Sequence, residues 1–380
     1  MEEYTELTTR LVALAKDLIL FPSTISRPDD RERCFQFIKN HVDAVEHVRT
    51  TEYRSSGFPS LLALPNDVDE PVILLCGHLD VVQHAGTEKY IGTVLDGRLE
   101  GVGAGDMKGA LAVLLELFRD LHHRYTDLSL GLAVTSDEEV GGENGLGYLV
   151  DELGCRSGIA LIPDGGSLNE ITVEEKGVLH LEVNCQGCQG RSPHAARPWL
   201  SDNPLETLLT RLARLRSHFD ALVTGGDHWY PTCAITGVET PNESINRVPE
   251  SARAILDVRF PAPRTAESLL EEIRTVLGDG VDVRHLISAA PTYLSPDSLF
   301  VRIAEEVTGR PVTLVKEPAG SDARFLCRHG IPVILSRPLT GNLHGEDEWI
   351  DIGSMVLYYR ICERYVTEKL LKGESPPGGS

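Results

Sequence analysis

Several apolar runs in this chain stop abruptly and are followed at once by acidic or imidazole side chains, and this repeated junction constrains the fold most. Residues 72–76 are apolar without interruption and lead directly to Gly77 and His78. Residues 128–135 lead to three acidic residues at 137–139, and residues 158–162 lead to Asp164. Such runs are typical of strands that are buried on both faces of a parallel sheet. Ligands of these sheets bind beyond the carboxyl ends of the strands, so we expect the polar side chains to meet at one edge.

The spacing of apolar residues adds helices to these strands. It predicts a helix face at 4–20 and a largely apolar helix at 109–121. Later in the chain, Ser295 is the expected N-cap of a helix that begins at Pro296. A further buried strand at 332–335 and a last helix at 354–371 complete the pattern. Together these elements predict an α/β fold with a doubly wound, mostly parallel sheet.

The middle of the chain follows a different pattern of predicted strands and helices. From about residue 175 the sequence predicts an α+β unit, with strands at 178–185, 233–238, 251–260 and 281–287 and helices at 204–219 and 265–277. The α/β pattern is interrupted by this unit and resumes after it. We therefore expect a main domain formed by residues 1–174 and 293–380 and an inserted domain formed by residues 175–292.

Composition and charge exclude several classes of function. The 380 residues are 41% hydrophobic and 24% charged, which is usual for a globular protein. A net charge of -21 argues against binding to nucleic acid or to an anionic membrane, since both require a basic face. The N-terminus lacks the basic and apolar segments of a leader, and no apolar stretch approaches the ~20 residues of a membrane span. We expect a cytoplasmic protein.

The eight cysteines are spread thinly along the chain, unlike those of small disulfide-rich domains, so we expect free thiols. Cys185 and Cys188 form a single CxxC pair. Since no second pair completes a structural zinc site, a chance match is favoured over a redox or zinc motif.

The first candidate site residues are an imidazole and two aspartates. His78 and Asp80 stand two positions apart, so on a strand they would point to the same side, where the carboxylate can orient the imidazole. Asp106 lies in a segment with glycines at 103, 105 and 109, whose small residues permit sharp backbone geometry and close approach of a metal. A carboxylate in this position could bridge two ions ~3.5 to 4 Å apart.

The remaining candidates follow other predicted strands. Glu138 and Glu139 are adjacent, and on an extended backbone one would bind a metal while the other faces the reacting water. Asp164 precedes two glycines, and His344 lies in a loop after the strand at 332–335; each supplies a further ligand. Any one of these segments alone would be an ordinary polar loop. In combination they predict a two-metal hydrolytic centre.

These segments resemble the ArgE/DapE/aminoacylase family of di-zinc metallopeptidases, which also includes dipeptidases and glutamate carboxypeptidases. The resemblance covers nearly the whole chain and rests on the order and spacing of the blocks at 77–82, 103–109 and 136–139. It implies a catalytic main domain that holds two divalent ions, most simply zinc, with cobalt or manganese as alternatives. The implied ligands are His78 and Asp164 on one ion, Glu139 and His344 on the other, and Asp106 as the bridge.

The resemblance also assigns supporting roles. It implies that Glu138 is the general base, that Asp80 supports His78, and that a cis peptide bond follows Asp106. The inserted domain resembles the family's lid and dimerisation domain, which implies a homodimer. His194 matches the family's oxyanion-stabilising histidine, which is often contributed by the partner subunit. Asn246 and Arg259 match residues that bind the substrate carboxylate in the family. A loop that begins at Gly320 resembles the family's substrate-carboxylate loop.

We predict that the protein hydrolyses an amide bond in a small amino-acid derivative with a free carboxylate. The N-acyl amino acid deacylases, such as deacetylases and desuccinylases, are one candidate class. Many deacylases of the family have Glu where this chain has Asp164, and Asp is more typical of its aminopeptidases and dipeptidases. Aminopeptidase, dipeptidase or carboxypeptidase action on short peptides therefore stays open. A metal-binding scaffold without turnover, or a thiol redox protein that uses Cys185 and Cys188, is a minor alternative.

Overall fold

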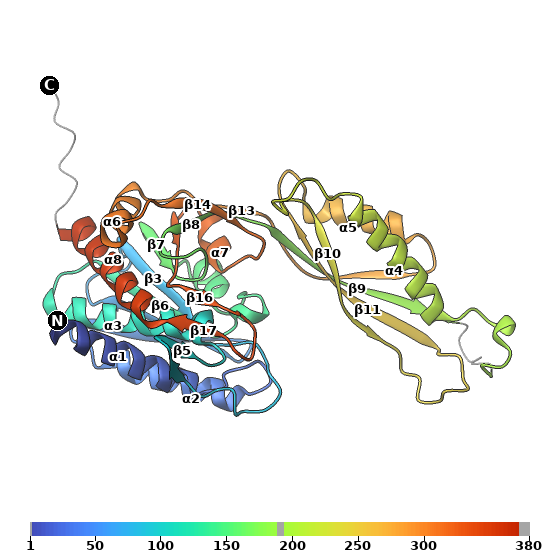
Figure 1. The fold of residues 1–380 in the computed structure, drawn as a ribbon, viewed down its shortest axis with the longest axis horizontal. Coiled ribbons are helices and arrows are strands. Elements are labelled where there is room, and N and C mark those ends of the chain that lie inside the picture. The colour runs from blue at the N-terminus through green and yellow to red at the C-terminus, as the bar shows by residue number, and fades with distance from the viewer. Residues whose placement is uncertain (1, 188–193, 372–380) are drawn as a thin grey trace, which may run out of the picture. The chain divides into compact units, whose positions relative to one another are not determined.

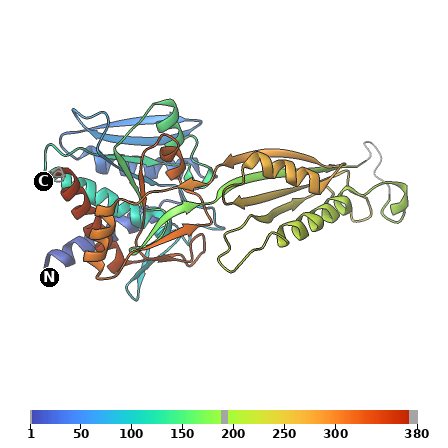
Figure 2. The same ribbon diagram turned by 90° about the horizontal axis from the view of Figure 1, so that it is seen from above.

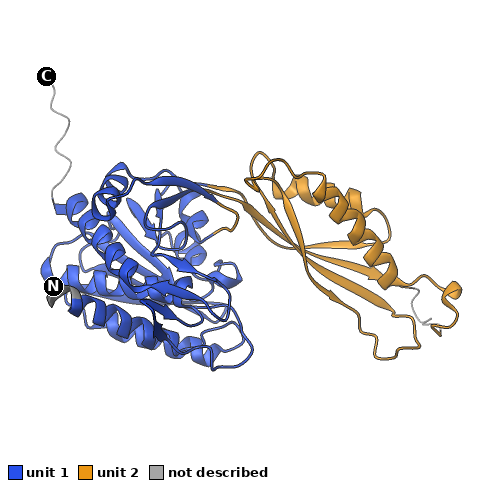
Figure 3. Cartoon of the chain, viewed as in Figure 1, with its two compact units in different colours: residues 1–173, 293–316, 321–380 blue, residues 174–292, 317–320 orange. Residues whose placement is uncertain are grey.

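The chain forms two compact units in the computed structural model, which describes residues 2–187 and 194–371 (Figures 1 and 3). The first unit consists of residues 1–173, 293–316 and 321–380, and the second of residues 174–292 and 317–320. The second unit is thus inserted between the two main segments of the first.

A six-stranded mixed sheet forms the centre of the first unit. Its strand order is β1-β2-β6-β3-β7-β15. The pairs β6–β3, β3–β7 and β7–β15 are parallel, whereas β1–β2 and β2–β6 are antiparallel. The carboxyl ends of the four parallel strands therefore lie along one edge. The strands are β1 (Val48–Ser55), β2 (Phe58–Pro65), β3 (Ile73–His78), β6 (Leu130–Thr135), β7 (Ile159–Ile162) and β15 (Val333–Leu335).

Both faces of this sheet are covered. Along β3, Ile73 and Leu75 pack into one hydrophobic cluster and Leu74 and Cys76 into another, as expected for alternate residues of a strand. Helices α1, α3, α6 and α8 pack against one another on the side of the first cluster, and α7 contributes to the second (Figures 1 and 2). No helix in the described ranges is both long and apolar enough to span a membrane. The helices of this unit are α1 (Glu2–Ile19), α2 (Pro28–Asp43), α3 (Gly109–Arg124), α6 (Ser298–Thr308), α7 (Ala323–Cys327) and α8 (Ile352–Leu371).

Two small sheets complete this part of the fold. One has the order β16-β17-β5-β4 and brings segments near residues 100 and 350 together, because Trp349 pairs with Glu100. The other has the order β13-β8-β14 and lies where the chain passes between the units. Their strands are β4 (Thr93–Leu95), β5 (Arg98–Glu100), β16 (Thr340–Gly341), β17 (Trp349–Asp351), β8 (Glu170–Glu175), β13 (Thr292–Tyr293) and β14 (Thr313–Glu317).

The second unit is an antiparallel sheet with the order β10-β11-β9-β12 and two helices. Leu179, Leu181 and Val183 of β9 alternate with more exposed polar residues and pack with helices α4 and α5 into one core. The elements are β9 (Gly177–Gln186), α4 (Pro204–Asp220), β10 (Thr232–Glu239), β11 (Ser251–Phe260), α5 (Ala266–Leu277) and β12 (Asp282–Ala289).

The start of α6 differs from the sequence prediction. The N-cap is Asp297, and the helix begins at Ser298 rather than at Pro296. The Asp297 carboxylate accepts a hydrogen bond from Leu299 N at 2.8 Å and another from the Tyr365 hydroxyl at 2.8 Å. Ser295 makes no cap, because aspartate offers one oxygen to the first turn and a second oxygen to α8.

Candidate metal centre

Six side chains predicted as site residues meet beyond the carboxyl ends of the parallel strands. They fall into two groups of three, and within each group one potential ligand atom from every residue lies within 4.8 Å of the others. The first group is His78, Glu138 and Asp164, and the second is Asp106, Glu139 and His344.

The register of the central strands explains how the first group forms. His78 is the last residue of β3 and pairs with Thr135, the last residue of β6. Leu75 pairs with Leu161 of β7, and continuing this parallel register by three residues places Asp164 beside His78. Residues far apart in sequence thus converge because parallel neighbouring strands end at the same edge.

Asp106 lies between the two groups. Its Oδ1 is 3.3 Å from His78 Nε2, and its Oδ2 is 3.2 Å from His344 Nε2. His344 Nε2 is also 3.5 Å from Glu139 Oε2. The two carboxylate oxygens of Asp106 therefore face one imidazole from each group, as a bridging carboxylate requires.

A tight turn at Ala104–Lys108 presents Asp106. The peptide bond between Asp106 and Met107 is cis, as the family resemblance implies. Gly103 precedes the turn with φ of 81°, a conformation that favours glycine. Gly105 has no room for a side chain, since a Cβ would lie 2.7 Å from Leu343 Cδ2. The turn therefore packs closely against the loop that carries His344.

Glu348 holds this turn and was not predicted from the sequence. Its side chain is buried, and its Oε1 accepts hydrogen bonds from Gly105 N and Asp106 N, both at 2.7 Å. Its Oε2 accepts one from Gly103 N at 3.0 Å. Because Glu348 closes the loop of His344, one carboxylate fixes the turn of Asp106 against a second ligand-bearing loop. No local sequence pattern indicates a contact between residues so far apart in the chain.

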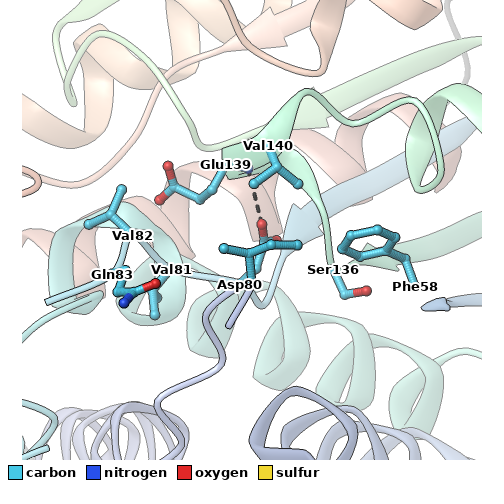
Figure 4. Close-up of a pocket in the computed structure, with 9 residues that line it drawn as sticks. Phe58, Asp80, Val81, Val82, Gln83, Ser136, Glu139 and Val140 are labelled. Atoms are coloured by element: carbon cyan, nitrogen blue, oxygen red, sulfur yellow. Dashed lines mark hydrogen bonds between the residues drawn. The ribbon is translucent and has the colours of Figure 1, made fainter. Parts of the chain in front are cut away.

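Asp80 contacts His78, but differently from the prediction. Strand β3 ends at His78, so the two residues do not share a strand face. His78 Nδ1 lies 3.1 Å from the backbone carbonyl oxygen of Asp80 and 3.5 Å from its carboxylate. The Asp80 carboxylate instead accepts hydrogen bonds from Glu138 N at 3.3 Å and Glu139 N at 3.0 Å, the second drawn in Figure 4. Asp80 thus couples the imidazole to the turn of the two glutamates.

The backbone of these glutamates is also different from the prediction. Glu138 and Glu139 lie in a single 3-10 turn, Glu138–Val140, and not on an extended segment. Two N–H groups at the start of this turn point at the Asp80 carboxylate, which favours the helical over the extended conformation. The two side chains still diverge, because Glu138 belongs to the first group and Glu139 to the second.

A small cavity of about 150 Å³ borders the turn (Figure 4). Asp80 and Glu139 form one side of it. The rest is mainly apolar, with lining residues Ile25, Phe58, Val81, Val82, Gln83, Ser136 and Val140. Apolar side chains therefore border the second group on the side of Glu139, whereas His344 is exposed.

The carboxylates of the centre repel one another. Burial and the neighbouring Asp164 raise the pKa of Glu138 well above its usual value. Burial and the Asp106 charge raise the pKa of Glu139 to about 8 and that of Asp164 to about 7. Divalent cations would offset this repulsion and keep the carboxylates ionised at neutral pH.

Asp106 behaves differently because two imidazoles face it. Burial would raise its pKa, but close contacts with His344 and His78 hold the pKa well below the usual range. The contact with Asp106 in turn raises the pKa of His344 to about 9. Burial acts to lower the pKa of His78, yet Asp106 and Asp80 raise it well above the usual value. Without a cation, protons thus occupy the imidazole positions that a metal would take.

The donor set fits divalent cations. Both groups combine carboxylate oxygens with one imidazole nitrogen, which zinc, cobalt and manganese all accept. Glu139 Oε1 is buried without a hydrogen-bond partner in the described ranges, although a buried polar atom normally has one. A cation would satisfy this atom.

The other predicted site residues belong to the second unit. His194 is exposed and forms an isolated bridge with Arg247, and Ala195 N donates to the carbonyl oxygen of Asn246 at 2.7 Å. Asn246 precedes β11, whereas Arg259 lies near the end of this strand. The part of β11 that lies between them in the chain is about 25 Å long. The two residues therefore lie toward opposite ends of this strand.

Arg259 already has a partner within the unit. Its Nε and Nη2 donate to the two carboxylate oxygens of Asp257 at 2.7 and 3.1 Å. Gly320 belongs to the same unit, in the short segment 317–320. His194 and Asn246 thus lie at the end of β9 and β11 opposite to the end where the chain enters and leaves this unit.

The cysteines of the described ranges are free. Cys185 is buried in the core of the second unit, and burial raises the pKa of its thiol, which disfavours the reactive thiolate. Cys188, the other half of the CxxC pair, lies outside the described residues.

Two further charged residues border the first group. Asp322 lies in the predicted loop that begins at Gly320, whereas Arg337 was not predicted as a site residue. Asp322 is buried, shares a small pocket with Glu138 and Asp164, and has a pKa raised well above its usual value by burial and by Asp137. Arg337 lies beside Asp164, with Nη1 3.7 Å from Oδ1. The sequence did offer a signal for Arg337, because it stands two residues beyond a predicted strand.

Comparison with known proteins agrees with this geometry. A family model described as "Peptidase family M20/M25/M40" matches residues 74–368. The chain is 31% identical over 273 residues to the succinyl-diaminopimelate desuccinylase of Parvibaculum lavamentivorans, covering 67% of this chain and 68% of that protein. It is 33% identical over 309 residues to the protein of the same name from Methylobacterium radiotolerans, covering 73% and 75%.

Solved structures share the fold at low sequence identity. Human carnosine dipeptidase 1 matches with a TM-score of 0.79 and 15% identity, covering 97% of each chain. The M20 family metallo-carboxypeptidase Sso-CP2 of Sulfolobus solfataricus matches with a TM-score of 0.77 and 17% identity, covering 94% of this chain and 98% of that one. The predicted α/β fold class is thereby confirmed. The chain belongs to peptidase family M20/M25/M40 and, as predicted, is a metal-dependent hydrolase of amide bonds.

Proposed function

We propose that this enzyme hydrolyses N-acyl amino acids at a dinuclear centre, with zinc as the first candidate metal and cobalt or manganese as alternatives. The observation that carries the proposal is the position of Asp106, whose two oxygens face imidazoles of two separate ligand groups. An arrangement with one shared carboxylate suits two cations better than one.

His78 and Asp164 would hold one cation, and Glu139 and His344 the other, with Asp106 shared between them. When bound, two such ions lower the pKa of a shared water and polarise the carbonyl group of the substrate. Backbone N–H groups keep the ligands in place through Asp80 and Glu348, so little reorganisation is needed when substrate arrives.

Glu138 is the proposed general base. Its carboxylate lies with His78 and Asp164, so it stands within reach of a water at this group. In the proposed reaction Glu138 takes a proton from the attacking water and returns it to the leaving amine. Burial raises its affinity for a proton, which suits a group that must hold the proton between these two steps.

His194 would stabilise the oxyanion, and Asn246, Arg259 and the loop at Gly320 would bind the substrate carboxylate. Because Asn246 and Arg259 lie at opposite ends of β11, we propose that the protein is a homodimer in which His194 and Asn246 act on the substrate held by the partner subunit. The second unit would then serve as both lid and dimerisation domain.

The choice of an acyl substrate rests on the curated relatives, which are named desuccinylases at about 30% identity, whereas the peptidases among the solved structures share only the fold. A panel of N-acetyl and N-succinyl amino acids and dipeptides, each assayed with zinc, cobalt and manganese, tests the proposal. We expect the highest kcat/KM on an N-acyl amino acid. If the enzyme hydrolyses dipeptides and no N-acyl amino acid, the proposed deacylase function is wrong and a peptidase function takes its place.

A further inference from the structure

Arg337 is a cationic side chain in the same row as two predicted metal ligands. Leu335, the last residue of β15, pairs with Ile162, the last residue of β7. Continuing this parallel register by two residues places Arg337 beside Asp164, as the register of β7 and β3 places Asp164 beside His78. The fold therefore brings a guanidinium to the edge of the sheet where the substrate would be hydrolysed.

The backbone of Arg337 is fixed by its neighbours. Ser336 is fully buried, its hydroxyl donates to Ser167 O at 2.8 Å, and its carbonyl oxygen accepts from the Tyr358 hydroxyl at 2.5 Å. The next residue, Pro338, has a restricted φ angle. Arg337 thus projects from a rigid segment rather than from a flexible loop.

The guanidinium itself has few partners. Its side chain is only 14% exposed, yet in the described ranges it makes a single ion pair, with Asp164 at 3.7 Å, and no hydrogen bond. Its Nε is buried without a partner. Arg324, another arginine near the centre, differs because it donates to the carbonyl oxygen of Gly141 and pairs with Glu143. Most of the five N–H donors of Arg337 remain available.

A buried guanidinium needs compensation by an anion. Asp164 provides only a loose contact, and a cation bound to this carboxylate would compete for its charge. A planar anion with two oxygens would accept hydrogen bonds from the unused N–H groups of the guanidinium. Among substrate groups, a carboxylate has this shape and this negative charge.

We propose that Arg337 recognises a carboxylate of the substrate directly beside the metal centre. This inference rests on the proposed function and adds a specificity residue in the first unit to the substrate-binding residues of the second. The carboxylate is either at the end of a dicarboxylic acyl group or on the amino-acid part of the substrate.

Matched substrates distinguish these two sources. An N-succinyl and an N-butyryl amino acid have acyl chains of equal length and differ in the terminal carboxylate. An N-butyryl amino acid and its carboxamide differ in the α-carboxylate. Arg337→Met should lower the preference in kcat/KM for the charged member of one pair by about tenfold or more, and Arg337→Lys should keep part of that preference. The pair that responds identifies the source. If neither ratio changes, Arg337 does not recognise a carboxylate.

The variant Arg328→Met is the matched control, because Arg328 is half exposed and pairs with Asp151 away from the centre. It should leave both ratios unchanged. The metal content of Arg337→Met is measured in parallel. An equal loss on all substrates together with a lower metal content would mean that Arg337 only holds Asp164, which overturns the inference.

A binding measurement separates failure of this inference from failure of the proposed function. Calorimetry on the metal-loaded wild-type enzyme would compare succinamate with butyramide, and an α-amino acid with its amide, whether or not any N-acyl substrate is hydrolysed. Tighter binding of the ligand that carries the carboxylate under test, lost by about tenfold or more in Arg337→Met, supports Arg337 as the anion site. Equal affinities in wild type and variant overturn it, even if the enzyme proves to be a deacylase.

Discussion

The chemistry of individual residues follows from the crowding of carboxylates at one sheet edge. Asp106 is held ionised between two imidazoles, whereas burial and mutual repulsion favour the protonated forms of Glu138, Glu139 and Asp164. Cations would reverse this preference for the ligands. The same residue type can therefore act as a bridge, a terminal ligand or a base, depending on its neighbours.

Replacement of Glu138 by Gln should abolish most of the activity without emptying the centre. Loss of a general base typically lowers kcat by about 10²- to 10⁴-fold, and we expect a decrease in this range. Glu143→Gln provides a control, since Glu143 is exposed and lies in the same loop region. Steady-state kinetics with parallel metal analysis make the comparison. A variant that keeps its metal ions and near wild-type kcat would assign the proton transfer to another group.

At the scale of elements, the buried carboxylates of Asp80 and Glu348 each fix a turn that carries site residues. Asp80 accepts the N–H groups of the turn that carries Glu139, and Glu348 accepts those of the turn that carries Asp106. Hydrogen bonds between backbone N–H groups and a buried carboxylate are of the stronger, charge-assisted kind. Each turn is thus fixed before a metal binds.

Removal of the Glu348 carboxylate should loosen the turn of Asp106. Glu348→Ala leaves three N–H groups without their acceptor, and we expect the free energy of unfolding to fall by about 1.5 to 3 kcal/mol or more. We also expect weaker uptake of metal. Denaturant unfolding of the metal-free protein and a metal titration measure the two effects. Glu346→Ala is the control, since Glu346 is exposed and pairs only with Lys89 in the described ranges. Equal behaviour of both variants would contradict the role of Glu348.

The sequence predicts most elements because their signals are local. Strand β11 has the predicted bounds of 251–260, and α4 ends one residue beyond its predicted end. The start of α6 was misplaced because Asp297 caps the helix through a carboxylate that also contacts α8, a contact distant in sequence.

In the site, too, features with a local sequence signal were predictable, whereas most of those set by contacts distant in sequence were not. His78, Asp106, Glu139 and Asp164 were predictable because glycines and strand ends mark them in the sequence. Glu348 was not predictable, since its importance comes from contacts with segments far away in the chain. Arg337 was missed, although it follows a predicted strand by two residues, as Asp164 does. The conformation of Glu138 and Glu139 was also mispredicted, because the carboxylate of Asp80 favours a helical turn there.

At the scale of the whole molecule, metal binding and stability are linked through protons. In the metal-free fold the pKa of Asp164 is about 7, that of Glu139 about 8 and that of His344 about 9, all above the usual values of roughly 4 and 6.5. Between the usual pKa of each group and its raised pKa in the fold, the folded state binds more protons than the unfolded state. The stability of the fold therefore falls as pH rises through this range.

The melting temperature of the metal-free protein should decrease from about pH 5 to about pH 9. The metal-loaded protein should melt at a higher temperature and show a smaller decrease, because cations replace the bound protons. Thermal unfolding in chelator and in zinc at several pH values makes this test. Identical slopes with and without metal would show that these groups do not bind the cations.

The proposed dimer is also a property of the whole molecule. His194 and Asn246 lie at the end of the second unit opposite to its chain connections, so we expect each to serve the partner's centre. Light scattering should give twice the chain mass of 41.6 kDa at assay concentrations. His194→Ala and Glu138→Gln, each inactive alone, should recover part of the activity when mixed and allowed to exchange subunits. A fully active monomer would contradict this arrangement.

The central claim is that two cations share Asp106. A crystal structure of the zinc-loaded protein with anomalous diffraction at the zinc edge tests it most directly. We predict two peaks about 3.5 to 4 Å apart on opposite sides of the Asp106 carboxylate. One would be bound by His78 and Asp164 and the other by Glu139 and His344. No peak, or a single peak that Asp106 does not contact, would contradict the account.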